Sequence, residues 1–246
     1  MSSKQLLPLF LSVKTLNWRM NDRNSMEADL EFQRQRKKAL DRDNHTCRFC
    51  GFRNNKWQEV HHFNDDHADN RLENLITTCT YCHMCQHIGL AGANREAILI
   101  YRPEITQAQL HHLVRTAQVA ERHYESLKAE DTTGTAKRSP NLKIAGEAAE
   151  MAKALMAALK ASAEGARQHI LTSDPHDLAN ALMLLPDEAY AKRRESLAGI
   201  RLLPLGVRNQ GSENIMPAMV DSWRTGGSVY SNLAPNTWKT LISQFS

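Results

Sequence analysis

The sequence has no long run of apolar residues, and nothing at its N-terminus resembles a secretory signal peptide. A bilayer crossing needs about 20 consecutive, mainly apolar residues, and lipidation signals are missing as well. We therefore expect a cytoplasmic protein without membrane insertion, which reaches the inner face of the membrane only through partners. Because the cytosol is reducing, we do not expect its five cysteines to form disulfides.

A strong excess of one charge is also missing, since 31 Lys and Arg face 27 Asp and Glu for a formal net charge of +4. The distribution of charge is more informative, because basic residues gather between Arg34 and Lys56, around the first cysteine pair. Such a segment suits contact with nucleic-acid phosphates. Interleaved acidic residues such as Asp41 and Glu59 make a solvated surface an equally good interpretation.

Four of the five cysteines form two C-x2-C pairs, Cys47 with Cys50 and Cys79 with Cys82. Each pair can reach one metal ion from a tight turn, and two pairs supply the four thiolates of a closed tetrahedral site. This pattern predicts a structural Zn²⁺ ion. Cys85 continues the second pair as C-x2-C-x2-C and is interpreted as a small apolar residue or an alternative ligand.

Hydrophobic periodicity predicts an α+β fold with strands confined to the first half of the chain. A capping box of Thr106 and Gln109 opens a helix with an apolar face, on which His111, His112 and His123 are expected to point to the polar side. The other predicted elements before it are an edge strand at 6–13, a helix at 26–40, a strand at 57–63 with a loop at 64–70, a helix from the second cysteine pair to His87, and a strand at 98–101.

The second half is expected to be mainly helical. The Ala-rich segment 144–171 carries a narrow apolar stripe, and Asp174 with Pro175 resembles an N-cap followed by a first helical residue. We expect four regions: a zinc-binding domain at 1–129, a linker at 130–141, a helical region at 142–205, and an irregular tail at 206–246. Isolated aromatic residues in that tail would bind a partner.

The zinc region resembles the His-Asn-His (HNH) nuclease motif in the version that carries zinc knuckles. The resemblance rests on three segments in order, Glu59–His62, Asn70–Leu75 and Cys79–His83. It implies an HNH-like ββα unit, two strands and a helix, which grips a catalytic divalent metal separate from the structural zinc.

Carried over residue by residue, the resemblance implies a role for each polar side chain of the motif. His62 would be the general base, His61 and His83 would bind Mg²⁺ or another divalent metal, and Asn74 would hold the loop. A neutral imidazole is a suitable base near pH 7. The chain departs from the family by having a histidine before the base, where a carboxylate is common, and His67 and His87 are rival ligands.

A second resemblance covers roughly residues 30–127. The segment Leu99–Leu110, together with Asn70–Leu75 and C-x2-C-x2-C, looks like the IcmJ (DotN) family of Dot/Icm type IVB secretion systems, and Ile200–Pro204 is similar to that family as well. The likeness implies a zinc-binding subunit of the type IV coupling complex that is held on an extended segment of the coupling ATPase. Family members resemble HNH nucleases in fold but are regarded as structural.

Three functions follow from these patterns. The first is a structural adaptor subunit of a type IVB secretion coupling complex, bound to the coupling ATPase. The alternative is a metal-dependent HNH DNA endonuclease with His62 as its base, which the full set of His61, His62 and His83 favours. A nucleic-acid binding module without catalysis is the third, so enzymatic activity stays open at this point.

Overall fold

The computed structural model describes residues 5–13, 25–66, 68–130, 140–226, 228–232 and 234–244. Among these residues, helices dominate and three small two-stranded sheets accompany them, so the expected α+β class is confirmed. Buried residues from Leu11 to Ile242 form one continuous hydrophobic cluster that joins the cysteine region to the C-terminal helices. Within the described ranges, no helix combines the length and hydropathy that a bilayer crossing requires.

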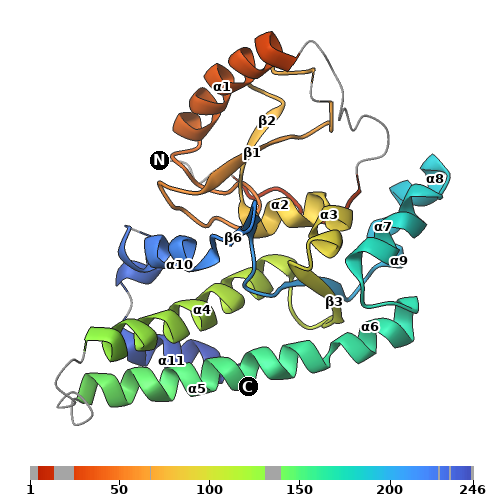
Figure 1. The fold of residues 1–246 in the computed structure, drawn as a ribbon. Coiled ribbons are helices and arrows are strands. Elements are labelled where there is room, and N and C mark those ends of the chain that lie inside the picture. Colours follow the sequence, from red (N-terminus) through yellow and green to blue (C-terminus); the bar gives the residue numbers. More distant parts are fainter. Residues whose placement is uncertain are drawn as a thin grey trace.

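The N-terminal part is built around a hairpin. Strands β1 (Gln58–His62) and β2 (Leu75–Cys79) pair antiparallel, and helix α2 (Thr80–Gln86) follows directly. Helix α1 (Ser25–Arg42) lies across this hairpin, as Figure 1 shows, and Ala39 and Leu40 pack against the strands in a small separate core. The predicted helix at 26–40, the strand at 57–63 and the helix that follows the second cysteine pair are confirmed, whereas the HNH identity of the unit is an inference from sequence.

A second sheet joins distant parts of the chain. Strand β3 (Ala97–Tyr101) pairs antiparallel with β4 (Ile200–Pro204), with Leu99 opposite Leu202. The strand β4 lies inside the region that we expected to be helical. Its short apolar run has no local strand partner. Pairing with β3 satisfies part of its backbone, and the Gln107 side chain binds the amide and the carbonyl of Leu202, at 2.9 and 2.7 Å.

Three helices form the layer below the cysteine region. Helices α4 (Gln107–Glu130) and α5 (Pro140–Ala161) lie side by side, and α11 (Pro235–Ser243) packs against both (Figure 1). The predicted capping box begins α4, since the Thr106 amide donates to Gln109 Oε1 at 2.8 Å. Leu155 and Leu159 of the expected apolar stripe are buried in the main hydrophobic cluster.

Short helices complete the chain around β3. They are α3 (Ile88–Ala93), α6 (Ala163–Ile170), α7 (Pro175–Met183), α8 (Asp187–Ala191) and α9 (Arg193–Ser196). The predicted N-cap is confirmed, because Asp174 Oδ1 accepts a hydrogen bond from the His176 amide at 2.8 Å. Helices α3 and α7 pack so closely that a Cβ atom at Gly92 would lie 2.4 Å from the His176 amide nitrogen.

Two segments differ from expectation. Residues 5–13 are irregular rather than an edge strand, because their backbone bonds singly to separate partners, such as Ser12 N to the Cys85 carbonyl at 2.8 Å. Residues 206–246, expected to be irregular, contain β5 (Asn209–Gln210), β6 (Glu213–Asn214), α10 (Met216–Thr225), the 3₁₀ helix η2 (Val229–Asn232) and α11. Trp223, Tyr230 and Trp238 are buried within this chain.

Residues 131–139 of the predicted linker lie outside the described residues. The division into four regions stays a prediction.

Candidate metal centres

The four C-x2-C cysteines converge. Cys47 and Cys50 lie in a turn after α1, while Cys79 ends β2 and Cys82 lies in the first turn of α2. All four are buried free thiols, and their sulfur atoms lie within 4.8 Å of one another. The turn is closed by hydrogen bonds from the Cys47 amide to the Phe52 carbonyl and from the Gly51 amide to the Cys47 carbonyl, each 2.9 Å, and Gly51 takes a φ of 74°.

The spacing of these thiols fits a tetrahedral metal ion. With zinc–sulfur bonds of about 2.3 Å, the sulfur atoms of a regular tetrahedron lie roughly 3.8 Å apart. Cys50 Sγ and Cys79 Sγ are 3.7 Å apart. The hydrogen bond with Cys47 lowers the pKa of the Cys50 thiol to about 6, whereas burial raises the pKa of the Cys82 thiol. A metal cation among the four sulfur atoms would favour their ionised form together. The group can therefore hold a metal ion such as zinc.

Cys85 lies beside this group but does not join it in the described structure. His111 separates it from the centre, with Nδ1 3.4 Å from Cys82 Sγ and Nε2 3.8 Å from Cys85 Sγ. Burial raises the pKa of the Cys85 thiol, which favours the interpretation as a small buried residue. His111 is completely buried rather than on a polar face, and His112 Nε2 lies 2.8 Å from the Cys50 carbonyl oxygen.

Arg115 of α4 lies against the cysteine group and was missed by the sequence analysis. Its side chain is buried, with Nη2 2.6 Å from Cys79 Sγ and Nη1 4.0 Å from Cys50 Sγ. The guanidinium carbon lies 4.2 Å from the ring centre of Phe52 and 4.9 Å from that of Tyr81. Four thiolates and a divalent cation carry excess negative charge, which this guanidinium offsets. No local sequence pattern marks Arg115, because its contacts with the cysteines form only in the fold.

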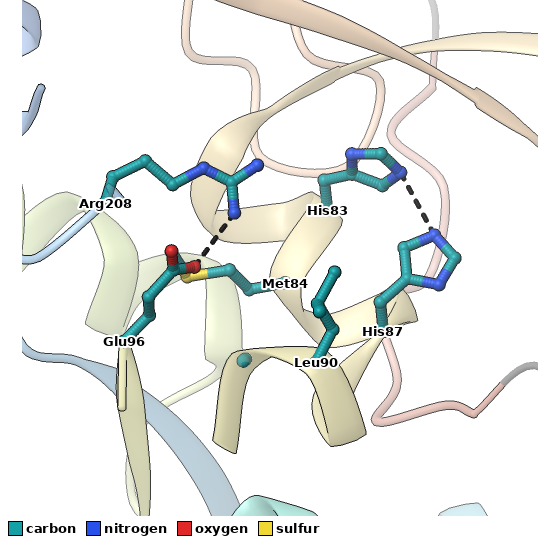
Figure 2. Close-up of a pocket in the computed structure, with 7 residues that line it drawn as sticks. His83, Met84, His87, Leu90, Glu96 and Arg208 are labelled. Atoms are coloured by element: carbon teal, nitrogen blue, oxygen red, sulfur yellow. Dashed lines mark hydrogen bonds and ion pairs between the residues drawn. The ribbon is translucent and has the colours of Figure 1, made fainter. Parts of the chain in front are cut away.

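Three histidines form a second group. His61 comes from β1, His83 from α2 and His87 from the residue after α2, and their ring nitrogens lie within 4.8 Å of one another. Figure 2 shows the His83 and His87 rings next to each other, with their Nε2 atoms 3.1 Å apart. The rings are held together by helical spacing, since residues four apart share one helix face. The structure therefore places the expected His61 and His83 with the rival ligand His87, while His67 lies outside the described residues.

Glu59 orients the histidine group through the His83 ring. Its carboxylate is hydrogen-bonded to His83 Nδ1, and its other oxygen accepts from Thr80 Oγ1 at 3.0 Å. A carboxylate on one ring nitrogen fixes the tautomer and leaves the other nitrogen for a metal. Burial opposes ionisation of Glu59, but the hydrogen bond and charge of His83, with the charge of Arg208, outweigh it and lower its pKa to about 2.

Arg208, from the C-terminal part of the chain, closes the edge of the group. It contacts Glu59 at 3.3 Å and Glu96 at 2.8 Å, and Figure 2 shows it across a small hollow from His83. The hollow measures about 60 Å³, which is room for water but not for a nucleotide. Glu59 lies in the motif segment 59–62, but no role was predicted for it, for Glu96 or for Arg208, because the three side chains meet only in the fold.

His62 lies apart from the three histidines. Neighbouring residues of a strand face opposite ways, so His62 turns from His61 and stacks on Phe32 with ring centres 5.2 Å apart. Its Nε2 lies 2.9 Å from Asn70 Oδ1, and the residue is 5% exposed. Asn74 bridges the loop between β1 and β2, accepting from the Asn64 amide at 3.0 Å and donating to the Asp69 carbonyl at 2.8 Å.

The basic segment near the first cysteine pair is partly structural. Arg42 donates to the carbonyls of Leu72 and Leu75, at 2.7 and 2.8 Å, and so ties α1 to the hairpin. Arg34, Lys37 and Lys38 are exposed on α1 and stay available to a partner.

No family model matches the chain. The chain is 34% identical over 114 residues to the type 4 apparatus protein DotN of Legionella pneumophila subsp. pneumophila. The aligned part covers 45% of this chain and 52% of that protein, so it spans about half the length of the relative. This similarity confirms the resemblance to the IcmJ (DotN) family that the sequence motifs indicated.

Proposed function

We propose that this chain is a metal-stabilised structural subunit of a type IVB secretion coupling complex, where it binds the coupling ATPase as an adaptor. The observation that carries the proposal is the 34% identity over 114 residues to a type 4 apparatus protein. The closed, buried set of four thiols supports a structural role, since such a site keeps no open position for a substrate.

In this proposal Cys47, Cys50, Cys79 and Cys82 hold Zn²⁺. The ion would join the turn after α1 to the start of α2. Free energy of metal binding at such sites is largely folding free energy. The chain's own residues then present a rigid surface to partners, and Arg115 balances the charge of the centre from α4.

The test is a two-component binding measurement with purified, zinc-loaded chain and the coupling ATPase of the same secretion system. We expect a complex of defined stoichiometry in analytical ultracentrifugation. A Cys79→Ser variant that has lost zinc should bind weakly or unfold, and an exposed Lys143→Glu variant serves as the folded control. A zinc-loaded, monodisperse chain that never binds the ATPase would contradict the proposal.

A second function, DNA cleavage of the HNH type, is favoured by one specific observation. The ring nitrogens of His61, His83 and His87 lie within 4.8 Å of one another, and Glu59 holds one of the rings. These residues fit a divalent cation, which when bound would stabilise charge on a phosphate. The acceptor Asn70 Oδ1 requires a proton on His62 Nε2, so any basic lone pair of His62 is on Nδ1.

A plasmid-cleavage assay distinguishes the two functions. Supercoiled DNA is incubated with the chain and Mg²⁺, Mn²⁺ or Ni²⁺, beside His62→Ala and Lys143→Glu variants at matched zinc content. A nuclease should lose cleavage in His62→Ala alone. Wild-type chain that binds a divalent ion at its histidines and cuts nothing would remove the nuclease function. Full cleavage by His62→Ala would instead remove the assignment of His62 as the general base.

A further inference from the structure

A cavity of about 490 Å³ lies on the side of the molecule formed by residues 9–11, the loop before α4, and the chain from α9 into β4. Three arginines line it, Arg193, Arg194 and Arg201, and no Asp or Glu does. In the part of the chain that the structure describes, none of these arginines forms an ion pair. This cavity is separate from both metal centres and has no role in the proposed function.

Two of the guanidinium groups are held in place by neutral acceptors. Arg193 donates to the Leu11 carbonyl at 3.2 Å and to Ser12 Oγ at 3.1 Å. Arg201 donates to the carbonyls of Ile105, at 2.7 Å, and Ile200, at 2.9 Å. Burial lowers the pKa of Arg201 more than the charge of Glu104 raises it. These bonds orient the cations but do not neutralise them, so the cavity favours an anion.

The third cation is placed differently. Arg194 is exposed, and its guanidinium carbon lies 4.7 Å from the ring centre of Phe10, with no other interaction among the described residues. Stacking on an aromatic ring leaves the in-plane N–H groups of a guanidinium able to bind a carboxylate in a bidentate manner. Arg194 is therefore the group that an incoming anion would reach first.

Apolar side chains make up the rest of the wall. Leu9, Leu11, Leu197 and Ile200 contribute aliphatic surface, and Tyr101 closes one side. A glycine at position 199 lets the chain pass close to Tyr101, because its φ is +84° and a Cβ atom there would lie 2.4 Å from the Tyr101 ring. Cations set in aliphatic surface suit a ligand that carries carboxylates and aliphatic side chains together.

We propose that this cavity binds a short acidic segment of another protein, with its carboxylates on Arg194 and Arg201 and an aliphatic side chain against Leu9 and Leu197. The volume of about 490 Å³ holds a few residues of an extended peptide. Nucleic acid fits less well, because base binding needs free aromatic faces, and the Phe10 ring is already covered by Arg194. The occupant is thus a peptide of alternating acidic and aliphatic character.

Fluorescence anisotropy with a short labelled peptide of alternating Glu and Leu tests this. We expect saturable binding to the full chain that weakens by about tenfold or more in Arg194→Glu, since hydrogen bonds to charged groups are strong. Lys143→Glu changes charge equally on the exposed surface of α5, outside the cavity, and should bind like wild type. A peptide with Gln in place of Glu should bind weakly.

Several results would overturn the proposal: no binding of the acidic peptide, equal binding of the Gln peptide, or unchanged affinity in Arg194→Glu. Tighter binding of a single-stranded oligonucleotide that Arg194→Glu abolishes would assign the cavity to nucleic acid instead. The assay contains no secretion component, so its failure would not bear on the coupling-complex proposal.

Discussion

Replacing Arg115 by Met should weaken both the fold and the retention of zinc. The guanidinium is buried, lies 2.6 Å from Cys79 Sγ, and is surrounded by the rings of Phe52, Tyr81 and Trp223. Removing one partner of a buried charge pair typically costs about 3–5 kcal/mol, because the remaining charge stays buried without compensation. For a domain of this size, that corresponds to a melting temperature lower by roughly 6–20 °C.

The metal should respond as well. A side chain that contacts the ligands of a metal ion, but not the ion itself, typically changes the affinity for the metal by about 10–100-fold. Arg115→Met should therefore lose zinc to a chromophoric chelator at a correspondingly lower chelator concentration. Arg115→Lys keeps the charge but lacks the planar group that fits between the rings, and we expect an intermediate loss. Arg167→Met, on the exposed face of α6, is the surface control.

Urea unfolding of the zinc-loaded proteins and chelator competition measure the two effects separately. If Arg115→Met unfolds with the wild-type free energy and holds zinc as tightly, then the guanidinium does not balance the charge of the cysteine centre. A loss of stability with unchanged zinc affinity would mean that Arg115 serves packing alone.

Three further outcomes are expected. Gly199→Ala should destabilise the chain by about 1–3 kcal/mol in thermal unfolding, because its positive φ and the Tyr101 ring leave no room for a methyl group; a neutral result would mean that the chain near β4 relaxes easily. Leu155→Ala should cost about 2–5 kcal/mol by leaving a cavity between α4 and α5, and urea unfolding would show no such loss if α5 were loosely attached. The hydrogen bond from Arg122 lowers the pKa of Asp221, although burial acts in the opposite direction. The ionised Asp221 therefore stabilises the fold fully at pH values above 3.8, its ordinary pKa, and this stabilisation is lost as the pH falls through the lowered pKa of the folded chain. In Asp221→Asn the free energy of unfolding should therefore depend less steeply on pH in the acid range than in the wild type. Parallel curves of unfolding free energy against pH for the two proteins would refute this.

Features that depend on neighbouring residues were predictable. The C-x2-C turns, the Thr106 capping box and the Asp174 N-cap each involve residues within a few positions, so the sequence shows both partners at once. The same holds for His83 and His87, which helical spacing brings to one face. Local patterns thus indicated most of the residues that could hold a metal ion.

Features that depend on contacts between distant segments could not be predicted from local patterns. The run at 200–204 forms a strand because it pairs with β3. The aromatic residues of the C-terminal part were expected to bind a partner, but they are buried in the core of this chain. Hydrophobicity alone does not say whether a side chain packs within its own chain or against another. The irregular course of residues 5–13 has the same origin, because their hydrogen-bond partners come from distant segments.

By itself, the sequence determined the two cysteine pairs, the α+β class and the likeness to a secretion-apparatus family, because these depend on short motifs and composition. Only the tertiary structure decided that Arg115 sits against the thiols, that Glu59 and Arg208 meet beside the histidines, and that three arginines line one cavity. The physical reason is that charge compensation acts through space, and these charges are brought together from elements far apart in the chain.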